Sequence, residues 1–179
     1  MRQPRAVCPR PINMVMTTEP TWLAYARRQI GVAEIVGPKN NPTIMAWAKK
    51  LGAKILGINV TDDESPWCGL FVAQCMNEVG IKPASVAVRA SSWDKWGVRV
   101  VPTLGCVLRF QRPGGGHVGF YVGENKTHYL VLGGNQGNKV SIASIEKARC
   151  VEARWPTGLP GTTKPVFTTI TGAASQNEA

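Results

Sequence analysis

The sequence predicts an α+β fold in which helices pack on an antiparallel sheet. The first half of the chain carries apolar residues at helical spacing, whereas the second half carries short apolar runs separated by short Gly-, Asn- and Pro-rich turns. Short connections favour antiparallel neighbours, and helices followed by strands are typical of the α+β class. At 179 residues, 44% of them hydrophobic, the chain suits a single packed domain.

We expect that domain to span residues 17–157, between an N-terminal tail, 1–16, and a C-terminal tail, 158–179. The first tail holds three prolines and no periodic pattern, and the last is rich in Thr, Gly and Pro. No apolar run reaches the ~18 residues of a membrane span, and the first residues lack the apolar region of a secretory signal. We therefore expect a protein made in the cytoplasm without a leader of its own.

The helical half divides into predicted helices that begin at a capping residue and end at a glycine. They cover 18–31, 41–52 and 65–80, and a shorter helical piece is expected at 92–96. Proline near the start of each of the three supports these boundaries. The third helix places Cys68 in its first turn.

The second half predicts a meander of about five strands, because runs with alternating apolar residues are separated by turn residues. The strands are expected at 106–110, 117–122, 127–132, 139–142 and 150–155. The helices are expected to pack on this sheet.

Five cysteines form an odd set without a C-x-x-C pair, so we expect reduced thiols rather than a disulfide framework or a zinc ribbon. They are Cys8, Cys68, Cys75, Cys106 and Cys150. At a helix start, Cys68 lies near the positive end of the helix dipole and near amides that could hydrogen-bond an oxyanion, and both favour a nucleophilic thiolate. The alternative for Cys68 is a small buried core residue.

His117 is the better candidate for the base that a cysteine nucleophile needs. It begins a predicted strand directly after Gly114, Gly115 and Gly116, where the absence of side chains leaves room for a neighbouring helix end or a substrate. His128 lies near the hairpin turn and is expected to be exposed.

Asn135 is the candidate third member of the site. If the two strands around the turn at Asn125 and Lys126 pair, His117 faces Gly134 or Asn135. An asparagine there could accept the imidazole N–H and fix its tautomer. The alternative is a turn residue that tolerates a left-handed backbone.

Four segments carry a resemblance to a known group of proteins. PWCGLFV, GGGHVGFYVG and LVLGGNQGN, in this order, resemble the motifs of the CHAP and NlpC groups of papain-like peptidases. The upstream segment IGVAEIVGPKNNPTIMAWAK resembles a phage-associated subfamily of these proteins, so the resemblance covers roughly residues 20–156. In place of a glutamate that many CHAP members have beside the third residue, this chain has Gly133 and Gly134, and no upstream glutamine donor can be placed.

This resemblance implies a circularly permuted papain-like fold and hydrolysis of an amide bond in or next to peptidoglycan stem peptides. Cys68, His117 and Asn135 would be the catalytic residues, and no cofactor is implied. Residues beside them are expected to contact substrate: Trp67, Gly116 and Gln136. N-acetylmuramoyl-L-alanine amidase and stem-peptide endopeptidase activities both fit.

The charge favours an anionic partner, since 21 Lys and Arg exceed 11 Asp and Glu and give a net charge of +10. Peptidoglycan or another anionic envelope polymer agrees with the resemblance better than nucleic acid does. We expect a monomeric phage lysin that reaches the wall after release from the host cytoplasm, with a virion-associated or prophage enzyme as the alternative.

Other classes of function stay open. A noncatalytic module could hold wall polymer or nucleic acid through exposed tryptophans, and a Cys–His pair could instead transfer acyl groups. A metal held by His117, His128 and a cysteine is less favoured, and the acidic run TDDE lacks the spaced ligands of a calcium loop. The G-x-G-x-x-G match opens a strand, not a helix, which argues against a dinucleotide site.

Overall fold

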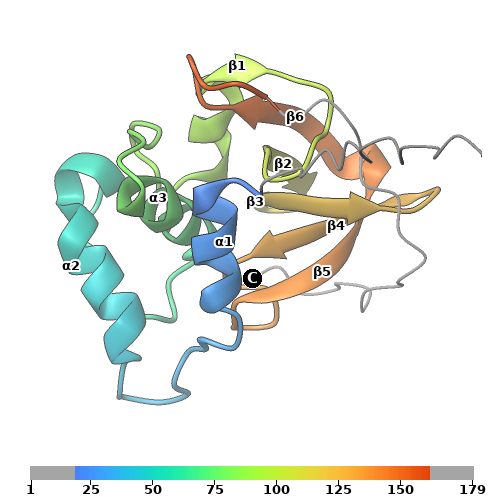
Figure 1. Cartoon of the computed structure of the whole chain (residues 1–179). Coiled ribbons are helices and arrows are strands. Elements are labelled where there is room, and N and C mark those ends of the chain that lie inside the picture. Colours follow the sequence, from blue (N-terminus) through green and yellow to red (C-terminus); the bar gives the residue numbers. More distant parts are fainter. Residues whose placement is uncertain (1–18, 162–179) are drawn as a thin grey trace, which may run out of the picture.

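The computed structural model describes residues 19–161 and has helices packed against one six-stranded antiparallel sheet (Figure 1). The α+β class predicted from the sequence is therefore confirmed. The predicted N-terminal tail, Thr18 and the C-terminal tail beyond residue 161 lie outside the described residues. No helix within the described range is both long and apolar enough to cross a bilayer.

Helix α3 is the central helix of the described chain. The helices are α1 Thr21–Arg28, α2 Pro42–Leu56 and α3 Cys68–Glu78, with short 3-10 helices η1 Ala90–Lys95 and η2 Lys147–Arg149. α3 packs on strands β3 and β4 of the sheet, and α1 and α2 flank it (Figure 1). This position places the first residue of α3, Cys68, at the boundary between helices and sheet.

Boundaries of all three predicted helices differ from the structure. α1 begins after the N-cap Pro20 and not after Thr18. Gly52 leaves helical geometry, with φ 66° and ψ 170°, but a helical turn resumes after it and ends at Gly57, because Leu56 is buried in the core. The third helix begins at Cys68 and not at Ser65, because Asp62 accepts hydrogen bonds from both the N–H and the hydroxyl of Ser65, each at 2.8 Å, and holds it in a turn.

The sheet is only in part the predicted meander. Its strands are β1 Val98–Arg99, β2 Val107–Arg112, β3 Gly115–Glu124, β4 His128–Gly133, β5 Ser141–Glu146 and β6 Cys150–Trp155, in the spatial order β1-β6-β2-β3-β4-β5. β2 to β5 follow one another, as predicted. β6 instead returns beside β2 through η2, where Ala153 and Trp155 become buried, and the two-residue β1 pairs with it.

On the His117 side of the β3–β4 hairpin, the two strands pair within one residue of the predicted register. Phe120 faces Leu132 and Tyr121 faces Val131, and an irregularity at Val122 shifts the pairs nearer the turn. An extra residue on one strand changes which side chains stand opposite each other beyond it. The residues opposite His117 could therefore not be assigned from turn length alone.

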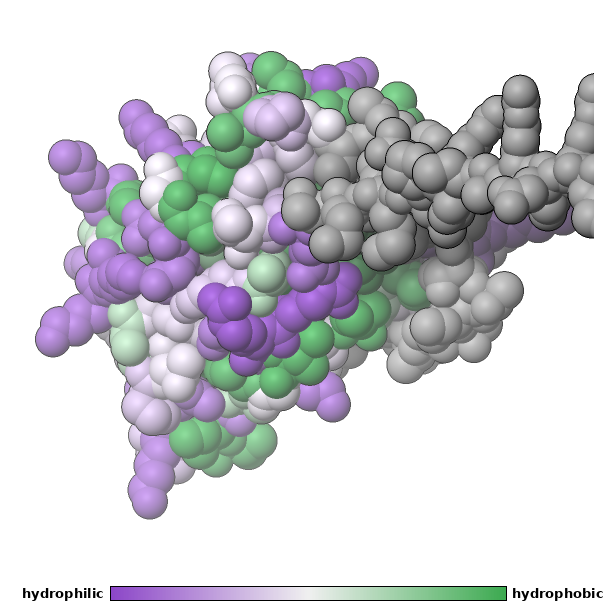
Figure 2. Space-filling view, viewed as in Figure 1, coloured by the Kyte–Doolittle hydropathy of each residue, from purple (hydrophilic) through white to green (hydrophobic). Residues whose placement is uncertain are grey.

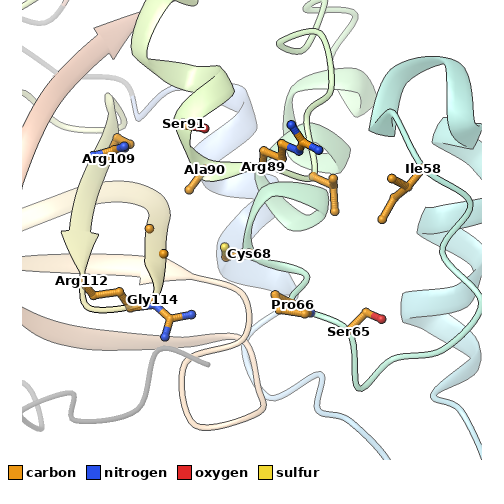
Figure 3. A pocket seen from close by; sticks show the side chains of 13 residues that line it. Ile58, Ser65, Pro66, Cys68, Arg89, Ala90, Ser91, Arg109, Arg112 and Gly114 are labelled. Atoms are coloured by element: carbon orange, nitrogen blue, oxygen red, sulfur yellow. The ribbon is translucent and has the colours of Figure 1, made fainter.

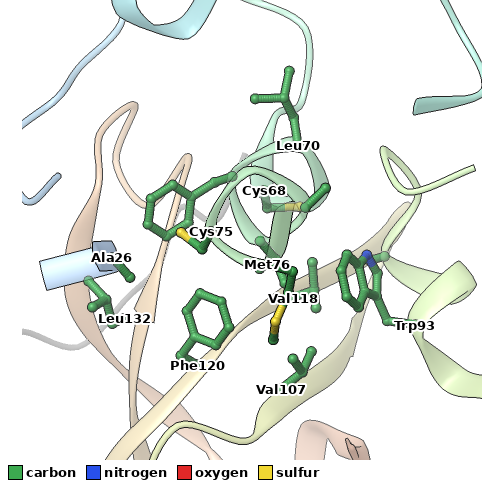
Figure 4. Packing of buried hydrophobic residues seen from close by; sticks show 14 of the residues in the cluster. Ala26, Cys68, Leu70, Cys75, Met76, Trp93, Val107, Val118, Phe120 and Leu132 are labelled. Atoms are coloured by element: carbon green, nitrogen blue, oxygen red, sulfur yellow. The ribbon is translucent and has the colours of Figure 1, made fainter. Parts of the chain in front are cut away.

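The main core lies between α3 and the sheet (Figure 4). Cys75 and Met76 of α3 face Val118 and Phe120 of β3, and all four are fully buried. Each large apolar side chain buried in this way stabilises the fold by about 1.5–3 kcal/mol. On the face seen in Figure 2, apolar residues form separate patches among hydrophilic side chains.

Candidate functional site

The start of α3 is held in place by a close backbone approach. At Gly69 a Cβ atom would lie 2.2 Å from the carbonyl oxygen of Ala87 and 2.5 Å from that of Val88. Only glycine lets the segment before η1 pass this close to the helix. The segment forms one wall beside Cys68, whose side chain is 4% exposed.

His117 projects from β3, where it pairs with Phe110 of β2, and it is fully buried. Its Nε2 atom lies 3.0 Å from Oε1 of Gln136, which belongs to the loop after β4. The amide nitrogen of Gln136 is also held in place. It donates to the carbonyl oxygens of Val131 at 3.2 Å and Ser141 at 2.6 Å.

These bonds determine the tautomer of the imidazole. Since the amide nitrogen of Gln136 points at two carbonyl groups, the oxygen must be the atom that faces His117. An amide oxygen only accepts hydrogen bonds, so Nε2 of the neutral ring carries the proton and donates it. The lone pair is therefore on Nδ1, which is the nitrogen able to take a proton from another group.

Two glycines let this loop approach the site. A Cβ at Gly133 would lie 2.8 Å from Oε1 of Gln136 and 3.1 Å from Nε2 of His117. A Cβ at Gly134 would lie 2.6 Å from atoms of both Trp67 and Phe71. The Gly-Gly pair thus permits the loop to fit between the histidine and the core below α3.

The residue that contacts Nε2 of His117 is Gln136, the neighbour of Asn135. Asn135 was expected to orient His117, but the side chain on Nε2 is that of Gln136, which was expected to contact substrate. Asn135 has φ 56°, the left-handed backbone named as its alternative role, and is buried. Gln136 is buried, and protein groups engage its amide on both sides.

Cys68 contacts the backbone of β3 at Val118, the residue after His117. Burial raises the pKa of its thiol above the ordinary value, while the backbone N–H groups of Val118 and Gly69 and the positive charge of Arg112 act in the opposite direction. A hydrogen bond with Val118 places the sulfur next to β3, one residue from His117.

The direction of this pKa shift corrects the expectation of a low-pKa thiol. Desolvation by burial outweighs the backbone hydrogen bonds and the charge of Arg112, so the pKa of the Cys68 thiol lies above its ordinary value. Yet Cys68 differs from the other described cysteines. The charge of Arg112 favours the Cys68 thiolate. Burial raises the pKa of the other three thiols, and nearby Glu78, Cys150 and Glu152 raise the pKa of Cys75, Cys106 and Cys150 further, in that order.

Cys68 lines a cavity of about 660 Å³ (Figure 3). In this view the thiol lies between the β2–β3 hairpin, which carries Arg112 and Gly114, and the segment of Arg89 that leads into η1. Gly116 also lines the cavity, as expected of a residue near substrate, and a Cβ there would lie 3.1 Å from that of Ala90. The cavity gives a ligand access to the thiol.

Trp67 was expected to contact substrate, and the structure corrects this. Its side chain is 1% exposed, packs against Trp47 and donates its indole N–H to Oε1 of Glu34 at 2.7 Å. Trp67 is a core residue that anchors the start of α3. His128 was expected to be exposed; it is half-buried near the hairpin turn, where its Nδ1 lies 2.8 Å from the hydroxyl of Thr127.

The acidic run before α3 has a local structural role. Asp62 closes the turn at Ser65, and Asp63, fully buried, accepts from the N–H groups of Ile35 at 3.0 Å and Asn41 at 2.7 Å. Among residues 19–161 no group of three or more His, Cys, Asp or Glu side chains is arranged to hold a metal ion.

Sequence reasoning missed the arginines of the cavity. Arg89, Arg109 and Arg112 line it from two segments that are distant in the chain. A partial indication was present, since Arg109 and Arg112 directly precede the glycine run before His117. Arg89 had no comparable indication, because only the packing of its segment on Gly69 brings it to the thiol.

No family model matches this sequence, and no curated protein shows significant similarity to it. The chemistry of the site therefore follows from its own groups. They are a thiol at a helix start, an imidazole of fixed tautomer and an open cavity lined with arginine. Such an arrangement can carry out nucleophilic attack on a carbonyl group.

Proposed function

We propose that this protein is a papain-like cysteine peptidase or amidase that cleaves an amide bond in or next to the stem peptides of peptidoglycan. Cys68 is the nucleophile, His117 the base and Gln136 the residue that orients the base. The observation that carries the proposal is the bond from His117 to Gln136 beside the Cys68 cavity, because it leaves Nδ1 as the proton acceptor.

The reaction begins when Nδ1 of His117 takes the proton of the Cys68 thiol and the sulfur forms a bond to the carbonyl carbon of the amide. The electron pair of the C=O bond moves to oxygen. When the tetrahedral intermediate collapses, the C–N bond breaks and His117 returns its proton to the departing amine. Water, deprotonated by His117, then attacks the thioester and releases the acid and the thiol.

The first turn of α3 can stabilise the oxyanion. Its first amide groups have no partner within the helix, and the helix dipole is positive there. Gly69 supplies an amide without a side chain next to the sulfur. The same amide groups favour the thiolate over the thiol, so they stabilise the Cys68 sulfur once His117 has accepted its proton.

The proposed papain-like design rests on the order of the elements. A helix that begins with the nucleophile precedes an antiparallel sheet that carries the histidine, and the orienting residue follows on the next strand connection. The sequence motifs around Cys68, His117 and Gln136 support the CHAP or NlpC relationship. Peptidoglycan as substrate, and a phage lysin acting at the wall, are supported by the same motifs and by the net charge of +10.

A noncatalytic binding module is less well supported. That alternative relied on exposed tryptophans, but five of the six are buried: Trp22, Trp47, Trp67, Trp93 and Trp155. The sixth, Trp96, is half-buried and donates its indole N–H to the carbonyl of Lys82 at 2.9 Å. The described surface therefore offers no aromatic platform of the kind that would hold a polymer.

Digestion of isolated sacculi tests the proposal. The wild-type protein, Cys68→Ala, His117→Ala and the control Cys150→Ala are incubated with sacculi, and released fragments are identified by mass spectrometry. New stem-peptide termini indicate an endopeptidase, and peptide-free glycan indicates an amidase. The first two variants should release nothing, whereas Cys150→Ala should match the wild type, because Cys150 does not line the cavity.

Two outcomes would overturn the proposal. Hydrolysis retained by Cys68→Ala would require another nucleophile. Fragments that carry an added amine in place of water would identify an acyltransferase. Circular dichroism of Cys68→Ala establishes that the fold is intact, since the substitution removes only a sulfur atom.

A further inference from the structure

The charged residues that line the cavity are all positive. Three arginines line it, Arg89, Arg109 and Arg112, and the described lining residues include no acid. Arg109 is balanced by Asp94 of η1, with Nε and Oδ1 3.1 Å apart. That pair holds β2 against η1 and leaves the positive charge of the cavity to the other two arginines.

Arg89 and Arg112 have no ion pair within residues 19–161, and the buried Nε of Arg112 has no hydrogen-bond partner there. A buried N–H group without a hydrogen-bond partner lowers the stability of the fold. Such a group beside a cavity is therefore a candidate contact for a ligand. The guanidinium of Arg112 is also near enough to favour the Cys68 thiolate. The unpaired charge therefore lies at the reacting sulfur and not at a remote surface.

We infer that Arg112 and Arg89 form a carboxylate-binding subsite that positions a free carboxylate of the substrate next to the scissile amide. The inference rests on the proposed function and adds the chemical feature by which the site selects its peptide. A guanidinium presents parallel N–H donors that match the two oxygens of a carboxylate. Figure 3 shows the two side chains on either side of Cys68, so a peptide over the thiol can reach them.

The two arginines have separable roles. Arg112 affects both the thiol and the carboxylate, because its charge favours the Cys68 thiolate. Arg89 is exposed and makes no comparable contribution to the thiol. Substituting Arg89 therefore tests recognition alone, and substituting Arg112 tests recognition together with the reactivity of the sulfur.

The experiment compares one soluble muropeptide with the same molecule after its free carboxylates have been converted to carboxamides. kcat/KM is measured for the wild type, Arg89→Gln, Arg112→Gln and the double variant. Arg28→Gln is the matched control, since Arg28 is an exposed arginine on α1 that does not line the cavity. Arg89→Lys tests whether the planar fork, and not charge alone, is required.

The wild type and Arg28→Gln should cleave the free acid about tenfold faster than the amidated peptide, as expected for loss of a charge-assisted hydrogen bond at a partly exposed site. Each Arg→Gln change should reduce this ratio, and the double variant should bring it to about one. Equal wild-type rates, or a preference that survives in the double variant, would overturn the inference.

A binding measurement separates this inference from the proposed function. Calorimetric titration of Cys68→Ala with both peptides requires no hydrolysis. Cys68→Ala should bind the amidated peptide more weakly than the free acid, and this difference should disappear when Arg89→Gln is added. That result supports the subsite even where cleavage fails. Equal affinities contradict it. If glycerol phosphate displaces the peptide and N-acetylglutamate does not, the site binds a wall phosphate. That result would overturn the assignment to a carboxylate.

Discussion

The side-chain oxygen of Gln136 lies 3.0 Å from Nε2 of His117, and both residues are buried. Because the amide nitrogen of Gln136 is engaged by two backbone carbonyls, the bond fixes both the orientation of the imidazole and the position of its proton. The loop after β4 thus orients the imidazole on β3.

Gln136→Ala should reduce kcat on the order of 100-fold with KM changed little, because the imidazole loses its preferred tautomer and direction while the cavity keeps its lining. Steady-state kinetics on soluble muropeptides provides the measurement. Asn135→Gly, which keeps the left-handed backbone at φ 56°, is the comparison and should lose less kcat. A larger loss in Asn135→Gly would return the orienting role to Asn135.

Gly133→Ala should cost at least tenfold in kcat while the chain stays folded. The new methyl group would lie 2.8 Å from Oε1 of Gln136 and 3.1 Å from Nε2 of His117, so it must push the two apart. Gly161→Ala is a suitable control, since a Cβ there meets nothing within 4 Å and its backbone is not left-handed. Unchanged kcat in Gly133→Ala would mean that this contact is not required for turnover.

Iodoacetamide should label Cys68 before Cys75 and Cys106, because Cys68 lines the cavity whereas the other two lie in the core. Burial raises the pKa of Cys68, so the labelling rate should keep rising above pH 8.5 without a plateau near neutrality. Arg112→Gln should slow the labelling at any one pH, because the pKa rises further when the cation is removed. Peptide mass mapping identifies the labelled site, and a rate that is flat from pH 6 to 8 would contradict this prediction.

Glu34→Ala should lower the free energy of unfolding by about 1–3 kcal/mol, since the indole N–H of the buried Trp67 loses its acceptor. Glu34→Gln keeps an acceptor oxygen and should stay within about 1 kcal/mol of the wild type. Urea unfolding followed by tryptophan fluorescence measures both. Equal losses in the two variants would show that the charge of Glu34, not its hydrogen bond, matters.

Alkaline pH should destabilise the fold in part through Cys106. Burial raises the pKa of this thiol to about 12, above the ~8.5 of an unfolded cysteine. The folded chain therefore binds the proton more tightly, and this stabilisation is complete below about pH 8.5 and is lost as the pH rises toward 12. Compared with the wild type, Cys106→Ala should show a shallower fall in unfolding free energy above pH 8.5, by up to about 1.4 kcal/mol per pH unit. Parallel curves would contradict the assignment.

Local chemistry explains which features could be predicted from the sequence. Asn41 caps α2, accepting from the N–H groups of Thr43 and Ile44, and Pro42 occupies its first turn. The strands around His117 follow from alternation of apolar residues. Cys68 at a helix start and His117 on a strand were identifiable because each depends on neighbours within a few residues.

Only the tertiary structure decided the remaining features. The path of the loop after β4 brings Gln136, not Asn135, to Nε2 of His117, and that path does not depend on local preference alone. Burial of Cys68, which reverses the expected direction of its pKa shift, requires packing by distant segments. Arg89 and Arg112 meet at the thiol for the same reason, since side chains far apart in the chain become neighbours only when helices and sheet pack together.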